Sequence, residues 1–93
     1  MAGGVQATAV GKNDNAAFDN STAIGFGATT TRANQVVLGG AGSSVTVGSL
    51  ASSTAAQSGP TFFATVDGSG TLGQGVATSS IATQAALATT NAN

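Results

Sequence analysis

The chain has 93 residues, only two basic and three acidic side chains, and a formal net charge of −1. Two basic side chains cannot neutralise a run of phosphates, so we expect no nucleic-acid partner. The sequence contains no histidine, cysteine or glutamate, so we expect no enzyme activity, no cofactor and no metal site.

The large apolar residues are too few for an ordinary globular core. Half of the 41% hydrophobic fraction is alanine, and Leu, Ile, Val and Phe together number only 18. Such a chain is either disordered or shares its core with identical neighbours. Disordered chains usually carry high net charge, and this one does not, so we expect self-association. No apolar run approaches the roughly 20 residues that span a bilayer.

One six-residue pattern recurs every 14 residues, at 6–11, 20–25 and 34–39. A fixed short period is typical of a solenoid, in which each unit forms one turn of a coil and stacks on the next. The residues before each final glycine alternate with a period of two, which indicates one short strand per unit. We therefore expect stacked coils over residues 1–48.

The alternation divides each strand into two faces. We expect the larger side chains to form the repeat core inside the coil, and the small ones to face outward where another chain approaches. The expected core is Val10, Ile24 and Leu38 with Thr22 and Val36 beside them, the expected outward face is Ala9, Ala23 and Val37, and the expected turn residues are Gly11, Gly25 and Gly39. Glycine suits such turns because it tolerates positive φ.

A second short strand per unit is expected at 28–31 and 43–47, and the β-prone run at 44–47 would close the stack. Residues 49–60 are rich in Ser, Ala and Gly and end at the only proline, which predicts a connector without regular structure. An Asp67-Gly68 pair then separates two β-prone segments and predicts a hairpin. We assign residues 49–78 to this connector with its hairpin.

Residues 79–93 are alanine-rich and free of glycine, which predicts the start of a helix capped by Ser79 or Ser80. A helix this short is marginal alone, so we expect it to join a coiled-coil stalk. Two seams fit, and both contain Ile81 and Ala88: Ile81, Ala85, Ala88 and Ala92, or Ile81, Gln84, Ala88 and Asn91. An inward-facing Asn91 would hold water or an anion.

Residues 20–28, Asn-Ser-Thr-Ala-Ile-Gly-Phe-Gly-Ala, and residues 31–39, Thr-Arg-Ala-Asn-Gln-Val-Val-Leu-Gly, carry a family resemblance. They resemble the head repeats of trimeric autotransporter adhesins, the YadA-like proteins of Gram-negative bacterial surfaces. The resemblance covers residues 5–50 and implies a mainly β homotrimer of left-handed parallel β-rolls above a trimeric coiled-coil stalk. It also implies a cell-surface fibre anchored in the outer membrane through a C-terminal region absent here. We therefore expect the sequence to be a fragment.

The leading hypothesis for function is a structural and adhesive segment that attaches to host or abiotic surfaces, with affinity from three-fold multivalency. The sequence names no ligand, and a spacer that binds nothing is the close variant. An ice-binding single-chain β-solenoid is the alternative, since Thr8 and Thr22 recur with the period of the repeat, although Val36 interrupts the series. We expect Asp14 and Asp19 to be solvated loop carboxylates rather than a paired catalytic site.

Overall fold

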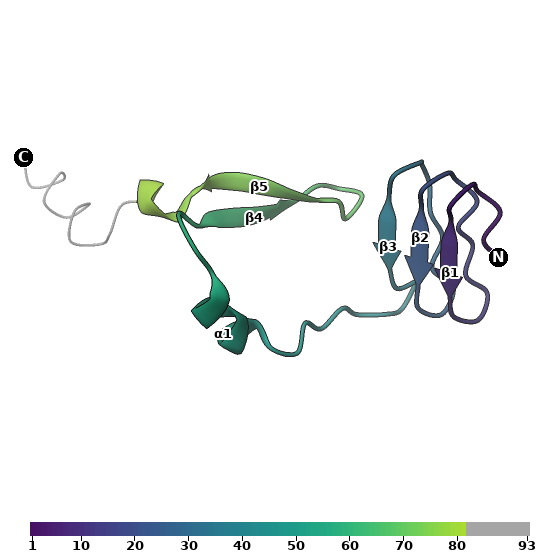
Figure 1. Cartoon of the computed structure of the whole chain (residues 1–93), viewed down its shortest axis with the longest axis horizontal. Helices are drawn as coiled ribbons and strands as arrows, with labels where there is room; N and C mark the ends of the chain where they lie inside the picture. Colours follow the sequence, from purple (N-terminus) through teal and green to yellow (C-terminus); the bar gives the residue numbers. More distant parts are fainter. Residues whose placement is uncertain (82–93) are drawn as a thin grey trace, which may run out of the picture. The chain divides into compact units, whose positions relative to one another are not determined.

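The computed structural model describes residues 1–81 and divides the chain into two compact units, Met1–Ser49 and Leu50–Asn93 (Figure 1). The first unit contains β1 (Thr8–Val10), β2 (Thr22–Ile24) and β3 (Val36–Leu38). The second contains α1 (Leu50–Ser53), a 3-10 turn (Thr54–Ala56), β4 (Phe62–Val66), β5 (Leu72–Ala77) and a second 3-10 turn (Thr78–Ser80).

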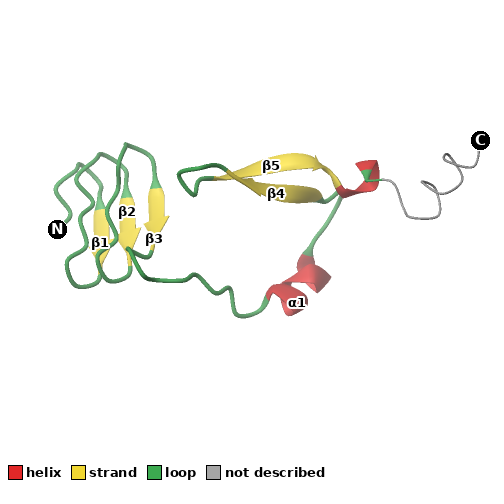
Figure 2. Ribbon diagram, turned by 180° about the vertical axis from the view of Figure 1, so that it is seen from behind, coloured by secondary structure: helices red, strands yellow, loops and turns green. Residues whose placement is uncertain are grey.

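The first unit is a parallel sheet whose strands lie in the order β1-β2-β3 (Figure 2). The register pairs each strand residue with its counterpart in the next repeat: Ala9 lies opposite Ala23, and Ala23 lies opposite Val37. The backbone ladder repeats with the same period, because Thr8 N donates to Ser21 O and Thr22 N donates to Gln35 O, both at 2.9 Å. Each repeat therefore advances the chain by one strand.

Left-handed backbone conformations also recur with the repeat. Gly11, Gly25 and Gly39, the expected turn residues, have φ of 137°, 107° and 84°. Three amide residues before the strands adopt the same region: Gln6, Asn20 and Asn34, with φ of 58°, 55° and 59°. Glycine and asparagine tolerate positive φ better than other residues, so the sequence supplies them where each coil bends sharply.

The core of the first unit consists of small side chains. Ala16, Ala23 and Ala28 are completely buried, and Ala7, Ala9 and Val37 pack against them partly buried. Within the described chain the largest fully buried side chain is Ser21, whose Oγ lies 3.2 Å from the Oγ1 of buried Thr30. The interior of each coil thus has room for little more than a methyl or hydroxyl group.

The expected orientation of the strands is therefore wrong. Ala9, Ala23 and Val37 face the interior, and the five residues expected to form the core do not: Thr22 is only partly buried, and Val10, Ile24, Val36 and Leu38 are exposed. The physical reason is that the interior is already filled: Ala16, Ala23 and Ala28 are completely buried and Val37 is only partly enclosed, so the row of larger side chains has no space there. Ala23 was likewise wrongly assigned to a surface between chains, since a single chain already buries it, whereas Ala9 and Val37 are only partly buried.

The return segments of the coils do not form the second strands that the sequence indicated. Among the described residues of these segments only an isolated bridge between Asn15 and Thr29 is present, and residues 43–47 are exposed without a strand. The turn of the second coil closes with Ala28 N donating to Gly25 O, whereas the third closes one residue later, with Ser43 N donating to Gly40 O. This extra residue takes the chain out of the register of the repeat.

In the second unit, the segment expected to lack regular structure contains α1 and the adjoining 3-10 turn. The Asp-Gly pair predicted a hairpin, and β4 and β5 do pair antiparallel across it, with Val66 opposite Leu72 and a bulge near Phe62 (Figure 1). Ile81 has extended backbone, with φ −83° and ψ 125°, so no helix has begun there. The rest of the expected helix, with Ala88 and Asn91, lies outside the described residues.

Candidate association surface

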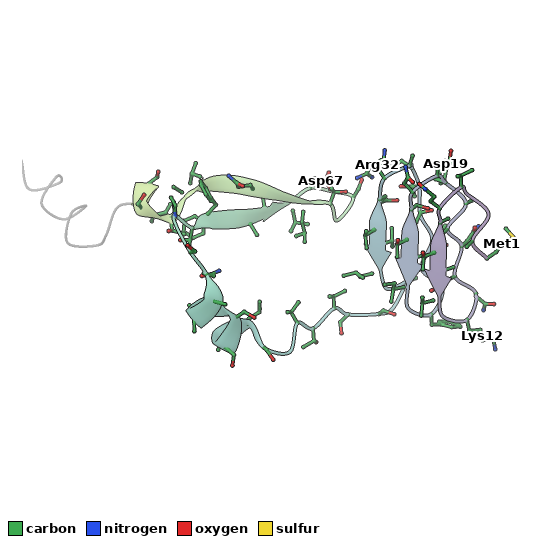
Figure 3. All side chains as sticks on the ribbon, in the orientation of Figure 1. Met1, Lys12, Asp19, Arg32 and Asp67 are labelled. Carbon is green, nitrogen blue, oxygen red and sulfur yellow. The ribbon has the colours of Figure 1, made fainter. Side chains whose placement is uncertain are left out.

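The outward side chains of β1, β2 and β3 form one continuous surface, which we call the outer strand face. Its six members are Thr8, Val10, Thr22, Ile24, Val36 and Leu38. The charged side chains of this unit lie elsewhere: Asp14 is buried in the segment between β1 and β2, and Lys12, Asp19 and Arg32 occupy the turns and loops that flank the strands (Figure 3). The outer strand face is therefore uncharged.

One row of this face is entirely aliphatic. Val10, Ile24 and Leu38 are paired across neighbouring strands, and their exposed fractions are 55%, 41% and 52%. Strands in a sheet lie about 4.8 Å apart, so the three side chains form an unbroken strip. Contiguous exposed apolar surface on a folded unit marks a site of association more often than isolated exposed residues do.

The second row is mixed. Thr8 lies opposite Thr22, and Thr22 lies opposite Val36, which is 65% exposed. Two threonine hydroxyls are thus followed by an aliphatic side chain that can neither donate nor accept a hydrogen bond. Hydrogen bonding by side chains along this row is limited to the first two coils.

Two aspartates connect successive coils. Asp14 Oδ1 accepts a hydrogen bond from Ala28 N at 3.0 Å, and Asp19 Oδ1 accepts one from Val5 N at 2.8 Å. Asp14 is only 2% exposed, so its prediction as a solvated loop carboxylate is wrong. The reason is that its partner lies one full repeat away along the chain, a contact that appears only when the coils stack.

The amide residues in left-handed conformation add a second connection between coils. Asn20 Nδ2 donates to Asn34 Oδ1 at 3.2 Å on the exposed side of the stack. Sequence reasoning missed this pair. The signal was present, because Gln6, Asn20 and Asn34 recur with the same spacing as the strands and asparagine is favoured at positive φ.

The hairpin of the second unit is a separate apolar surface. All residues of β4 are exposed, including Phe62 at 46% and Phe63 at 44%. Both phenylalanines line a shallow pocket of about 370 Å³ together with Pro60 and Gln74. A two-stranded hairpin alone is marginally stable in water, so this one is expected to gain stability from contacts beyond its own two strands.

Among residues 1–81, no group of three acidic, histidine or cysteine side chains is placed to hold a metal ion. The same residues include no helix long and apolar enough to cross a membrane. Of the expected stalk residues, Ile81 is 56% exposed, and Ala88 is outside the described part. No family model, no curated protein and no solved structure matches the chain.

Proposed function

We propose that the chain is a structural and adhesive segment of a trimeric bacterial surface fibre, formed by three identical copies that associate through their outer strand faces. The observation that supports the proposal is the uncharged aliphatic row of Val10, Ile24 and Leu38, which a single chain leaves half exposed. Burying these side chains against neighbouring copies gives the shared core that the composition requires.

Burial of this row contributes part of the free energy of association. Full burial of a valine, leucine or isoleucine contributes about 1.5–3 kcal/mol, so covering three half-exposed residues contributes about 2–4 kcal/mol per chain. Every copy presents the same row, and the face carries no charge with which to select a different protein. A second copy of the chain is therefore the partner that this surface suits best.

The remaining parts of the proposal follow the resemblance in residues 5–50. Residues 1–48 form a left-handed parallel β-roll head, and residues 49–78 form a connector between the head and a trimeric stalk. The fibre stands on the bacterial surface, anchored through a region beyond this sequence. Three copies of one surface bind host matrix or abiotic material through multivalency rather than through a deep pocket.

Light scattering on the purified chain tests the proposal. We expect three times the 8.7 kDa mass of one chain. Ile24→Asp places a charge on the row and gives the mass of a single chain with the circular dichroism of the β fold retained. Thr29→Asp, a matched control on the exposed return segment, keeps the trimeric mass. A monomeric wild-type chain, or a trimeric Ile24→Asp variant, contradicts the proposed assembly.

An ice-binding single-chain solenoid is a second candidate, because Thr8 and Thr22 lie side by side on the outer strand face. Ice binding needs a regular threonine array, and Val36 ends this one after two coils. Thermal hysteresis distinguishes the two functions: the trimeric fibre segment gives none. Hysteresis that disappears in Thr22→Val, in a chain of monomeric mass, favours the ice-binding function instead.

A further inference from the structure

We propose that the shallow pocket beside β4 and β5 is a binding subsite for a neutral saccharide, which stacks on a phenylalanine ring and bonds to glutamine amides. We call it the hairpin pocket, and its described lining includes Pro60, Phe62, Phe63 and Gln74. The inference rests on the proposed function for its biological role, since it gives the adhesive segment a class of ligand. The pocket itself is formed within one chain.

The hairpin pocket has the size of a small-molecule site and a fixed wall. Its volume of about 370 Å³ lies at the lower end of the ~300–1,000 Å³ that is typical of ligand sites. Thr78 N donates to Thr61 O at 3.0 Å, and the hydroxyl oxygens of the same two residues lie 2.6 Å apart. Thr61 is a lining residue, so this wall is in place before a ligand arrives.

A β-bulge lies beside the pocket. Phe62 is opposite Ala77, and Ala64 is opposite Gln74, so Phe63 on β4 faces two residues of β5. Bulges bend a strand and re-aim its side chains, and they are common next to functional sites. Consecutive residues of a regular strand point to opposite faces, yet Phe62 and Phe63 both line the hairpin pocket. The irregular strand thus brings two aromatic residues to one hollow.

The two phenyl rings offer an apolar surface for stacking. Phe62 and Phe63 are each nearly half exposed in the folded chain. One face of a pyranose ring consists of C–H groups with partial positive charge, which are attracted to the negative face of an aromatic ring. An alkyl chain gains no such attraction. The rings therefore favour a sugar ring over a lipid chain.

Two glutamine side chains supply hydrogen bonds that the described chain does not use. Gln57 and Gln74 both line the pocket, and neither side-chain amide has a hydrogen-bond partner within residues 1–81. Each amide carries donors and an acceptor, so one glutamine serves two neighbouring hydroxyls in opposite senses. Hydroxyls on adjacent ring carbons are the defining polar feature of a saccharide, and the lining matches them.

The lack of charge sets the kind of saccharide. None of the described residues that line the hairpin pocket is charged. An acidic sugar or a phosphate would lose hydration on entry and gain no opposite charge in return. A neutral sugar loses only the hydration of its hydroxyls, which the amides replace. The expected ligand class is therefore a neutral, hexose-containing saccharide.

Titration of the full chain followed by nuclear magnetic resonance tests the inference. Methyl β-glucoside is the neutral probe, methyl β-glucuronide is its acidic counterpart, and glycerol carries hydroxyls without a ring. We expect methyl β-glucoside to shift the amide signals of the pocket residues with half-saturation on the order of 1–10 mM. Equal shifts with glycerol, or tighter binding of the glucuronide, overturn the inference.

Gln74→Met and Phe62→Leu are the matched variants. The first removes the amide and keeps the length of the side chain, and the second removes the ring and keeps an apolar group. We expect each to weaken binding by about fivefold to tenfold with the circular dichroism retained. Leu72→Met, a change of similar size on the same hairpin outside the pocket lining, keeps the affinity of the wild type.

The outcomes separate this inference from the proposed assembly. A folded chain without saccharide shifts, or full affinity in both Gln74→Met and Phe62→Leu, overturns the inference. Pocket signals that respond to protein concentration but not to saccharide overturn it as well, because another copy then covers the pocket. A trimeric mass without saccharide shifts leaves the assembly standing, whereas saccharide shifts in a chain of monomeric mass overturn the assembly alone.

Discussion

The close approach of the second and third coils at Gly40 gives the sharpest stability prediction. A Cβ at this position would lie 2.6 Å from Phe26 O and 2.7 Å from Gly27 C, both backbone atoms that cannot rotate away. Real Cβ atoms essentially never come within 3.0 Å of such atoms, so the coils must separate. Forced expansion of this kind costs about 1–3 kcal/mol, and we expect Gly40→Ala to destabilise the first unit by that amount.

Two further glycines separate the steric effect from backbone strain. A Cβ at Gly42 meets nothing within 4 Å but φ is +86°, so Gly42→Ala costs about 1–2 kcal/mol through conformation alone. Gly48 is equally open and has no positive φ, so Gly48→Ala is neutral or stabilises by about 0.4–1 kcal/mol. We therefore expect the Gly48→Ala chain to be the most stable of the three variants, and the Gly42→Ala and Gly40→Ala chains to be less stable.

Thermal unfolding by far-ultraviolet circular dichroism measures these differences. The midpoint falls by about 4–8 °C per kcal/mol in a small domain. All variants must be compared at one protein concentration, because association with other copies raises the apparent stability. A Gly40→Ala chain that melts with the wild type would show that the coils do not approach closely at residue 40.

Three other substitutions test separate features. Ala23→Asp places an unpaired charge in the alanine core, and we expect the circular dichroism of the first unit to be lost, unlike in a variant of the outer strand face. Asp67→Ala removes the acceptor of Ser69 N and Thr71 N. We therefore expect the amide hydrogens of Ser69 and Thr71 to exchange faster with solvent, as measured by nuclear magnetic resonance. Unchanged exchange rates contradict the turn geometry. Asn34→Val and Asn34→Gly both remove the acceptor of Asn20 Nδ2, but only valine is strained at φ 59°, so we expect Asn34→Val to lower the midpoint more than Asn34→Gly does. Equal midpoints in the two variants exclude the left-handed conformation.

The local features of the fold were predictable where the sequence repeats itself. Residues 22–24 were expected to form a strand because the same pattern occurs one repeat before and one repeat after, and β2 lies there with that register. The hairpin was predictable from Asp67-Gly68, because the preference of an aspartate-glycine pair for a turn depends only on the few residues around it. Both signals depend on short stretches of chain.

Features that depend on the surroundings were not predictable in the same way. The run at 44–47 has high β propensity but forms no strand, because within the described residues no other segment pairs with it. Leu50–Ser53 forms a short helix in a segment whose composition indicated a loop. The burial of Asp14 depends on Ala28 N, which stacking brings to it from the next coil.

The sequence by itself determined the period of the repeat, the positions of the bends and the absence of charge from the strands. It also defined two faces on each strand through alternation. Only the tertiary structure decided which face is enclosed. The return segments place Ala16, Ala28 and Thr30 in the interior beside Ala23, and the space that remains accepts a methyl group but not the side chain of Ile24. Interior width depends on segments brought together by the coil, so the pattern within one strand cannot specify it.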